Sequence, residues 1–328
     1  MSFSDVIGHS RLTGWLAHDV AASTVGPAYL FLGPEGVGKR FLAEQFAQAL
    51  QCQAPVRGEA CARCPMCRLV AKGKHPDVLL VAVPAGGRQI VIEQIRQLQR
   101  WLSLTPFHGR RKVVIVDEAD TMQEAAASAL LKTLEEPPPT ATLLLIAVAE
   151  TRLLPTIVSR CARLPCGPLP TDQLLQVLAA QGVEPSRAAA VARQAGGRLG
   201  RARHLADEEV WTRQQAGVDA WLAAVQAGEV ELPLAARPRA EVEEWLESVA
   251  LWYHDLLLAQ SGADPALFTY PHRRRELQTQ AARSTPEETL QAVEAVYATR
   301  ALVQQRVNAR TAVAALIARL APDARGRR

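Results

Sequence analysis

In the first half of the chain, short and continuous apolar runs alternate with segments whose apolar residues fall at helical spacing. The runs at 28–32, 78–83, 112–116 and 142–149 are typical of strands that are covered on both faces. The apolar positions of the intervening helices are Phe41, Leu42, Phe46 and Leu50, then Ile92, Ile95, Leu98 and Leu102, with a further helix over 124–136. This alternation predicts an α/β fold built on a doubly wound parallel sheet.

The second half of the chain shows helical spacing without strand-like runs. Short helices are predicted within residues 168–207, and longer ones from residue 208 onward. One clear stripe, at positions i, i+1, i+4 and i+7, consists of Trp245, Leu246, Val249 and Trp252. Such a stripe usually packs into a core, and part of it could also serve an interface between subunits.

Composition places the chain among globular proteins of two or three domains. It has 328 residues, of which 48% are hydrophobic and 21% charged. The longest apolar run, 143–149, is too short to cross a bilayer, and the N-terminal residues lack the apolar core of a signal peptide. We therefore expect a cytoplasmic protein with no membrane partner. A net charge of only +4 means that any contact with nucleic acid would need a local basic patch or a larger assembly.

Residues 33–40 read GPEGVGKR, a phosphate-binding loop between a predicted strand and a predicted helix. Gly33, Gly36 and Gly38 would let backbone N–H groups surround a phosphate, and Lys39 would neutralise its outer oxygens. Arg40 stands where the motif has Ser or Thr, whose hydroxyl binds Mg²⁺, and a guanidinium has no acceptor atom. The loop is therefore predicted to be present but altered. A glycine-rich turn without function is the alternative.

Two carboxylates, Asp117 and Glu118, follow the predicted strand at 112–116. Ligands of parallel sheets bind at the carboxyl ends of the strands, so both acids are expected near the phosphate loop. In a nucleotide hydrolase, Asp117 would hold Mg²⁺ through water and Glu118 would orient the attacking water. The alternative is a pair of surface acids at the start of the next helix.

Four of the six cysteines, at positions 52, 61, 64 and 67, have the spacing C-x8-C-x2-C-x2-C. Two x2 spacings let turns present thiolates to one ion, and four sulfurs would complete a structural zinc site. Cys52, Cys61, Cys64 and Cys67 are therefore the predicted zinc ligands. Disulfides, which a reducing cytosol disfavours, and an iron–sulfur cluster are the alternatives.

The order of these motifs gives the chain a specific resemblance. The phosphate loop, the cysteine segment and the strings VVIVDEAD (113–120), ALLKTLEEPP (129–138) and SRC (159–161) resemble the bacterial clamp-loader ATPases of the AAA+ class. The resemblance covers about residues 5–205. It implies an AAA+ domain over 1–167 with a zinc module inserted at 52–67, a small helical lid over 168–207 and an all-α collar domain over 208–328.

That family contains motor subunits that hydrolyse ATP and a subunit that does not need to, and three departures indicate the second kind. Arg40 replaces the Mg²⁺-binding hydroxyl. The strand end where motors carry a polar sensor of the γ-phosphate reads Ala147-Val148-Ala149. Gly200 aligns with the sensing arginine of the lid, unless the register is wrong and Arg198 or Arg201 takes that place. The chain itself is thus not expected to be an active ATPase, and whether ATP or ADP binds stays open.

The resemblance also implies a role for Arg160. In the family, an arginine at this position crosses the subunit interface and acts as an arginine finger on the γ-phosphate held by a neighbour. The alternative is an ion pair at the domain edge. The partners implied are motor (gamma/tau) and delta subunits in a hetero-pentamer within the DNA polymerase III holoenzyme, and, through that complex, a sliding clamp and primer–template DNA.

The resemblance further implies that the interior of the loader follows the DNA backbone, where Arg96 and Arg100, four residues apart on the helix after Ile92, could reach phosphates. Solvated helix charges are the alternative for both arginines. Two other functions stay open for the chain: a self-sufficient ATP-hydrolysing motor, and a zinc-dependent DNA-binding module with a vestigial nucleotide site.

Overall fold

The computed structural model of this protein describes residues 2–108, 111–228 and 237–321. The chain divides into two compact units. The first unit consists of residues 1–173 with 198–200, and the second of residues 174–197 with 201–328.

The first unit is built on a five-stranded sheet of order β2-β3-β4-β1-β5, in which all neighbouring strands are parallel. The strands are β1 (Ala28–Leu32), β2 (Val78–Val81), β3 (Lys112–Val116), β4 (Ala141–Ala147) and β5 (Ala162–Pro165). The four predicted strands are confirmed to within a few residues. β5 was not predicted, because it has only four residues and three of them are exposed.

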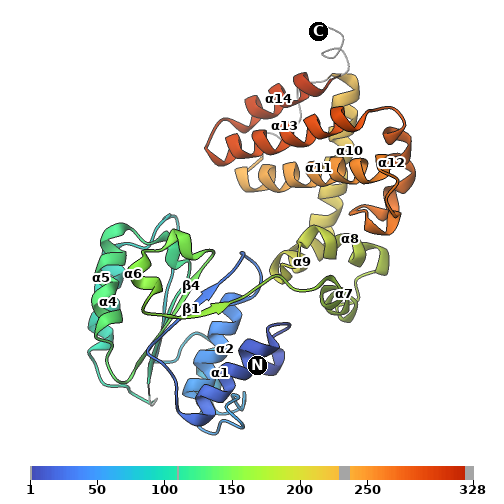
Figure 1. The fold of residues 1–328 in the computed structure, drawn as a ribbon. Helices are drawn as coiled ribbons and strands as arrows, with labels where there is room; N and C mark the ends of the chain where they lie inside the picture. The colour runs from blue at the N-terminus through green and yellow to red at the C-terminus, as the bar shows by residue number, and fades with distance from the viewer. Residues whose placement is uncertain (1, 109–110, 229–236, 322–328) are drawn as a thin grey trace. The chain divides into compact units, whose positions relative to one another are not determined.

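Helices cover both faces of this sheet (Figure 1). They are α1 (Ser10–Ala22), α2 (Lys39–Gln51), α3 (Pro65–Ala71), α4 (Ile92–Leu102), α5 (Glu124–Glu135) and α6 (Pro155–Val158). Alternate strand residues supply two separate cores: Leu30 and Leu145 lie in the core shared with α4 and α5, and Phe31 and Ile146 in the core shared with α1 and α2. The predicted doubly wound α/β sheet is confirmed.

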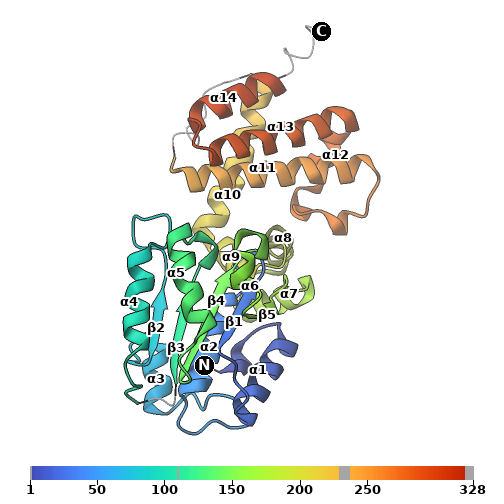
Figure 2. The same cartoon turned by 60° about the vertical axis from the view of Figure 1, so that its left-hand side comes forward.

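The second unit is helical, as Figure 2 shows for its larger part. Its helices are α7 (Thr171–Ala180), α8 (Pro185–Ala195), α9 (Leu199–Ala206), α10 (Glu208–Ala227), α11 (Arg239–Gln260), α12 (Arg274–Ala281), α13 (Pro286–Gln304) and α14 (Ala309–Leu320), the first turns of α7 and α9 belonging to the first unit. The predicted stripe on α11 is buried in their common core, with Trp252 fully enclosed. The finer division into a lid over 168–207 and a collar over 208–328 stays a prediction.

Candidate functional site

The phosphate loop joins the end of β1 to the start of α2, where the sequence predicts it. Gly36 and Gly38 both have positive φ, of 78° and 97°, and Gly38 caps α2 in the left-handed conformation. At Gly33, φ is 153°, and an added Cβ would lie 1.9 Å from the carbonyl oxygen of Cys166. The loop thus needs glycine at Gly33 for packing against the segment after β5, independently of any ligand.

Lys39, the first residue of α2, turns back onto its own loop. Its ammonium group donates hydrogen bonds to the carbonyl oxygens of Gly33 and Pro34, and only 7% of the residue is exposed. Burial lowers the pKa of Lys39, and the surrounding acids, among them Glu35 and Asp117, oppose that shift. The lysine therefore lies inside the loop that would cradle a phosphate.

Arg40 forms an ion pair with Asp117, the acid predicted to serve Mg²⁺. Its Nη1 lies 3.2 Å from Oδ2 of Asp117, and its Nε lies 3.0 Å from Oε1 of Glu44, one turn further along α2. The arginine side chain is half exposed, whereas that of Asp117 is only 16% exposed. The residues present do not fit Mg²⁺: the hydroxyl ligand is replaced by a cation, and that cation holds the carboxylate.

Glu118 lies beside Asp117 in a left-handed backbone conformation, with φ of 52°. Its pKa is raised, first by burial and then by the negative charges of Asp117, Glu35 and Asp120. The structure therefore brings together Lys39, Arg40, Asp117 and Glu118 at one end of the sheet, as the motif order predicts.

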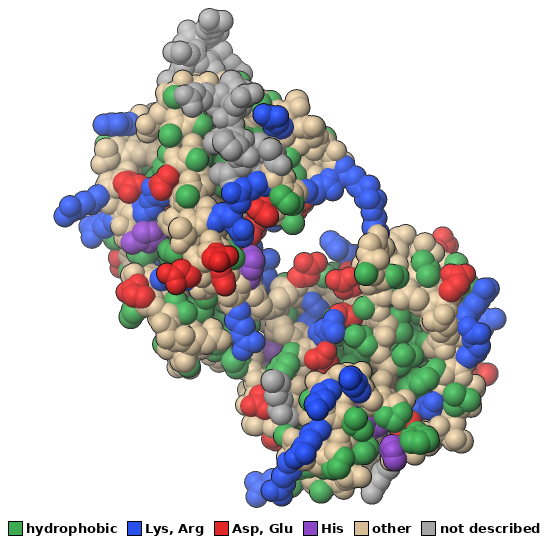
Figure 3. All heavy atoms as spheres, turned by 180° about the vertical axis from the view of Figure 1, so that it is seen from behind, with side chains coloured by type: hydrophobic (Ala, Val, Ile, Leu, Met, Phe, Trp, Pro, Cys, Tyr) green, Lys and Arg blue, Asp and Glu red, His purple; other side chains and the backbone are tan. Residues whose placement is uncertain are grey.

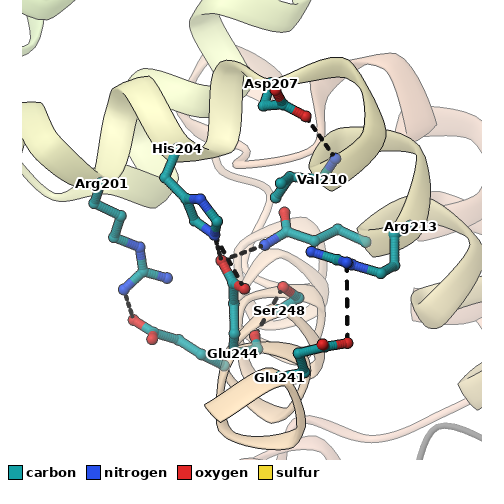
Figure 4. Close-up of polar contacts among 10 residues, drawn as sticks. Arg201, His204, Asp207, Val210, Arg213, Glu241, Glu244 and Ser248 are labelled. Carbon is teal, nitrogen blue, oxygen red and sulfur yellow. Dashed lines mark hydrogen bonds and ion pairs between the residues drawn. The ribbon is translucent and has the colours of Figure 1, made fainter. Parts of the chain in front are cut away.

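Gly200, on the first turn of α9, contacts the phosphate loop directly. Its backbone N–H donates to the carbonyl oxygen of Gly36 at 2.8 Å, and a Cβ at Gly200 would lie 3.3 Å from two Gly36 atoms. This contact supports the register in which Gly200 takes the position of the lid arginine. Arg201, the next residue, forms an ion pair with Glu247 of α11, beside the contact of His204 with Glu244 (Figure 4).

Arg160 lies between α6 and β5. Its Nη2 is 2.8 Å from Oε1 of Glu135 at the end of α5, and its Nη1 donates to the carbonyl oxygen of Thr156 at 3.0 Å. About a third of the side chain, 35%, stays exposed. The ion pair considered as the alternative is therefore present in the single chain. A partly exposed guanidinium in a weak surface pair is also free to exchange its partner at an interface.

The four clustered cysteines converge on one point after α2. The Sγ atoms of Cys52, Cys61, Cys64 and Cys67 all lie within 4.8 Å of one another. Amide hydrogen bonds from Arg63 and Cys64 lower the pKa of Cys61 to about 6, whereas burial raises the pKa of Cys52 and of Cys67. The donor set fits one tetrahedral zinc ion with no open coordination position.

The first unit is also similar to proteins of known identity. The family described as DNA polymerase III, delta subunit, matches residues 8–169. The delta-prime subunit of DNA polymerase III from Pseudomonas aeruginosa is 46% identical over 143 residues, which are 44% of this chain and 43% of that protein. Residues 8–169 of this chain thus match that DNA polymerase III family.

Two further relatives extend the comparison. The delta-prime subunit of Bacillus subtilis is 31% identical over 178 residues, 54% of this chain and 53% of that protein. The tau subunit of Escherichia coli is 33% identical over 215 residues, 64% of this chain and 33% of that protein. The chain thus spans about half the length or less of each relative. A solved gamma subunit-related protein of Thermotoga maritima has a TM-score of 0.45 at 17% identity, covering 94% of this chain and 97% of that one.

Arg96 and Arg100 are both exposed on α4, as expected for either DNA contacts or solvated charges. On the face of the molecule shown in Figure 3, acidic and basic side chains are interspersed over the surface. A row of Lys and Arg side chains also runs across the lower part of that face. Among the described residues, no helix has both the length and the apolarity that a membrane span requires.

Sequence reasoning missed two partners of the key arginines. Glu44 follows Arg40 by four residues on α2, and this spacing on a helix was a sufficient signal for the ion pair. Glu135 belongs to a motif already singled out, but its contact with Arg160 joins the end of α5 to the segment after α6. No local signal in the sequence reveals that second contact.

Proposed function

We propose that this chain is the delta-prime subunit of a bacterial DNA polymerase III clamp loader. It would act in the cytoplasm with motor (gamma/tau) and delta subunits in a hetero-pentamer that loads a sliding clamp onto primer–template DNA. It would hydrolyse no ATP itself and would supply Arg160 to the ATP held by a neighbouring motor subunit. The identity to two delta-prime subunits supports this proposal.

One observation carries the proposal: the contrast between Arg40 and Arg160. Arg40 occupies the place of the Mg²⁺ ligand and pairs with Asp117, so the chain's own site lacks the metal ligand that phosphoryl transfer uses. Arg160 keeps a partly exposed guanidinium in the segment before β5. A finger needs no nucleotide of its own, so it can work in a chain whose own site is altered.

The cysteine cluster has a structural role in this proposal. Cys52, Cys61, Cys64 and Cys67 would hold one zinc ion and thereby fix the segment between α2 and β2. Zinc in a four-thiolate site has no position for a substrate, so its contribution would be to folding stability alone. A closed structural zinc site is also compatible with the alternative of a zinc-dependent DNA-binding module, which duplex binding by the isolated chain would favour.

The competing function is an ATP-hydrolysing motor, which the similarity to the tau subunit favours. It requires hydrolysis in spite of the Arg40–Asp117 pair. Two measurements separate the possibilities. The isolated chain should show background ATPase activity, and robust turnover that disappears in Lys39→Ala would establish the motor.

The second measurement tests the finger. In a loader reconstituted with this chain, Arg160→Ala should leave the pentamer assembled and lower clamp- and DNA-stimulated ATP hydrolysis at the adjacent motor. Arg163→Ala is the matched control, since Arg163 is also an exposed arginine in an ion pair, with Glu150 at 3.4 Å. If the assembled loader with Arg160→Ala still shows wild-type stimulation of ATP hydrolysis, the role of Arg160 is only to form its ion pair with Glu135.

A further inference from the structure

We propose that Arg40 replaces the divalent cation of this phosphate loop, so that the loop binds a polyphosphate, such as the diphosphate of ADP, without Mg²⁺. Arg40 would contribute a permanent positive charge that the chain carries itself. The inference concerns the chain's own loop and does not depend on Arg160 acting in trans.

The position of the guanidinium is the first support. Arg40 follows Lys39 in the sequence, at the motif position of the Mg²⁺-binding hydroxyl residue, and its Nη1 lies 3.2 Å from Oδ2 of Asp117. Asp117 directly follows β3 and is the carboxylate to which a Mg²⁺ ion would be bound through water. The guanidinium therefore lies where the metal would connect this acid to a phosphate.

The chemistry of the guanidinium is the second support. It is planar, always charged and able to donate two parallel hydrogen bonds to phosphate oxygens, which makes arginine well suited to phosphate recognition. The hydrogen bond and charge of Glu44 raise the pKa of Arg40 further. The side chain is half exposed, and its pairs with Glu44 and Asp117 are of the weak surface type, so the guanidinium can turn toward a ligand.

The remaining parts of a polyphosphate cradle are present. Gly36 and Gly38 have the positive φ angles typical of loops whose backbone N–H groups bind phosphate, and the positive end of the helix dipole of α2 begins at Lys39. Lys39 would exchange its two carbonyl partners in the loop for phosphate oxygens. Two cations and the backbone then face the ligand without any metal.

Mg²⁺ should not improve this binding. An ion bound to the phosphates would lie close to the guanidinium, and the two cations would compete for Asp117. The altered loop thus favours the free polyphosphate over its Mg²⁺ complex, the reverse of the preference of a loop with Ser or Thr.

Calorimetric titration of the full isolated chain with ADP, in EDTA and in excess Mg²⁺, tests the inference. The wild type should bind at least as tightly in EDTA as in Mg²⁺. Arg40→Thr, which restores a hydroxyl, should weaken binding in EDTA by roughly tenfold or more, the scale of one charge-assisted hydrogen bond, and recover it when Mg²⁺ is added. Arg163→Thr should titrate like the wild type.

Pyrophosphate in place of ADP separates the contribution of the phosphates from that of the nucleoside. Competition by pyrophosphate in EDTA supports recognition of the polyphosphate, and Lys39→Ala should abolish binding in both buffers while circular dichroism shows it folded. Tighter binding of the wild type in Mg²⁺, or no binding of either ligand in EDTA, overturns the proposal. The assay contains no motor, clamp or DNA, so its failure leaves the proposed role of Arg160 intact.

Discussion

Two regions of the first unit each pair an arginine with a carboxylate, and the pairs have opposite consequences. At the phosphate loop, Arg40 holds Asp117, the acid that a nucleotide motor needs for its metal. Between α6 and β5, Arg160 holds Glu135, an acid with no predicted chemical role. The effect of an ion pair on function therefore depends on what its acidic partner would otherwise do.

The two pairs also differ in how they are supported. The Arg40 pair lies beside the phosphate loop, which is held by hydrogen bonds to its backbone. Lys39 donates to the carbonyl oxygens of Gly33 and Pro34, and the N–H of Gly200 in α9 donates to that of Gly36. Arg160 lies in a short segment and bonds to Thr156, Ser159 and Glu135. Arg160 thus bonds to three residues and is 35% exposed, whereas Arg40 bonds to Glu44 and Asp117 and is 50% exposed.

The largest expected effect concerns the predicted zinc ion, which should stabilise the region of α2 and not the segment around Arg160. Cys64→Ser should remove zinc and destabilise the segment after α2, since structural zinc contributes on the order of 10 kcal/mol to small zinc domains. Hydrogen exchange should increase in α2 and α3 while α5 and α6 stay protected. Metal analysis of the unoxidised wild type should find one zinc per chain. A wild-type chain without bound metal, or a Cys64→Ser variant that still binds zinc, would contradict the site.

Next in size is the geometry of the finger. Arg160→Lys keeps the charge but loses the planar fork, so it should fail nearly as badly as Arg160→Ala, by ~10³-fold at the motor site that the finger serves. Pre-steady-state hydrolysis in the assembled loader isolates that site from the motors that keep turning over. Arg163→Lys provides the control, and full rescue by lysine would reduce the role of Arg160 to that of a simple charge.

A smaller effect is expected from the backbone of the phosphate loop. Gly33→Ala should lower the free energy of unfolding by more than the roughly 1–3 kcal/mol of backbone strain alone, because its Cβ would also meet the Cys166 carbonyl. Gly38→Ala is the matched control: φ is also positive there, but nothing lies within 4 Å of the added Cβ. Denaturant unfolding that ranks the two variants equally would count against a packing role for Gly33.

The smallest effect concerns the partner of the finger. Glu135→Gln removes the charge that holds Arg160 and should change the free energy of unfolding by at most about 1 kcal/mol, the value of a surface pair. Stimulated ATP hydrolysis by the reconstituted loader should stay near the wild-type rate. A loss as large as that of Arg160→Ala would mean that the Glu135 contact itself is what the neighbouring site requires.

The sequence was sufficient for the parts of the fold that repeat a simple pattern. Continuous apolar runs predicted β1 to β4, and helical spacing predicted the buried stripe on α11, because burial on both faces of a sheet or on one face of a helix leaves a periodic trace. β5 leaves none: only Leu164 is buried, and Arg163 and Pro165 interrupt the run. Its place beside β1 is a property of the assembled sheet.

Residue partners at the site were harder to predict than the residues themselves. The motif identified Lys39, Arg40 and Asp117, but Arg40 and Asp117 are 77 positions apart. Arg40 lies in α2, which follows β1, Asp117 follows β3, and β4 separates these two strands in the sheet. Their pairing depends on strand order, which a motif does not encode. The same holds for Gly200, whose alignment suggested a position but whose hydrogen bond to Gly36 required the fold.

The contact between Gly33 and Cys166 affects what can be concluded from a glycine-rich phosphate-loop signature. β5 follows Arg160 and pairs with β1, and the residue after it rests against the glycine that opens the phosphate loop. Substitution of that glycine would thus displace the strand that follows Arg160, whether or not the loop binds a nucleotide. Packing alone therefore requires glycine at this position of the signature, so the presence of Gly33 is not in itself evidence of nucleotide hydrolysis.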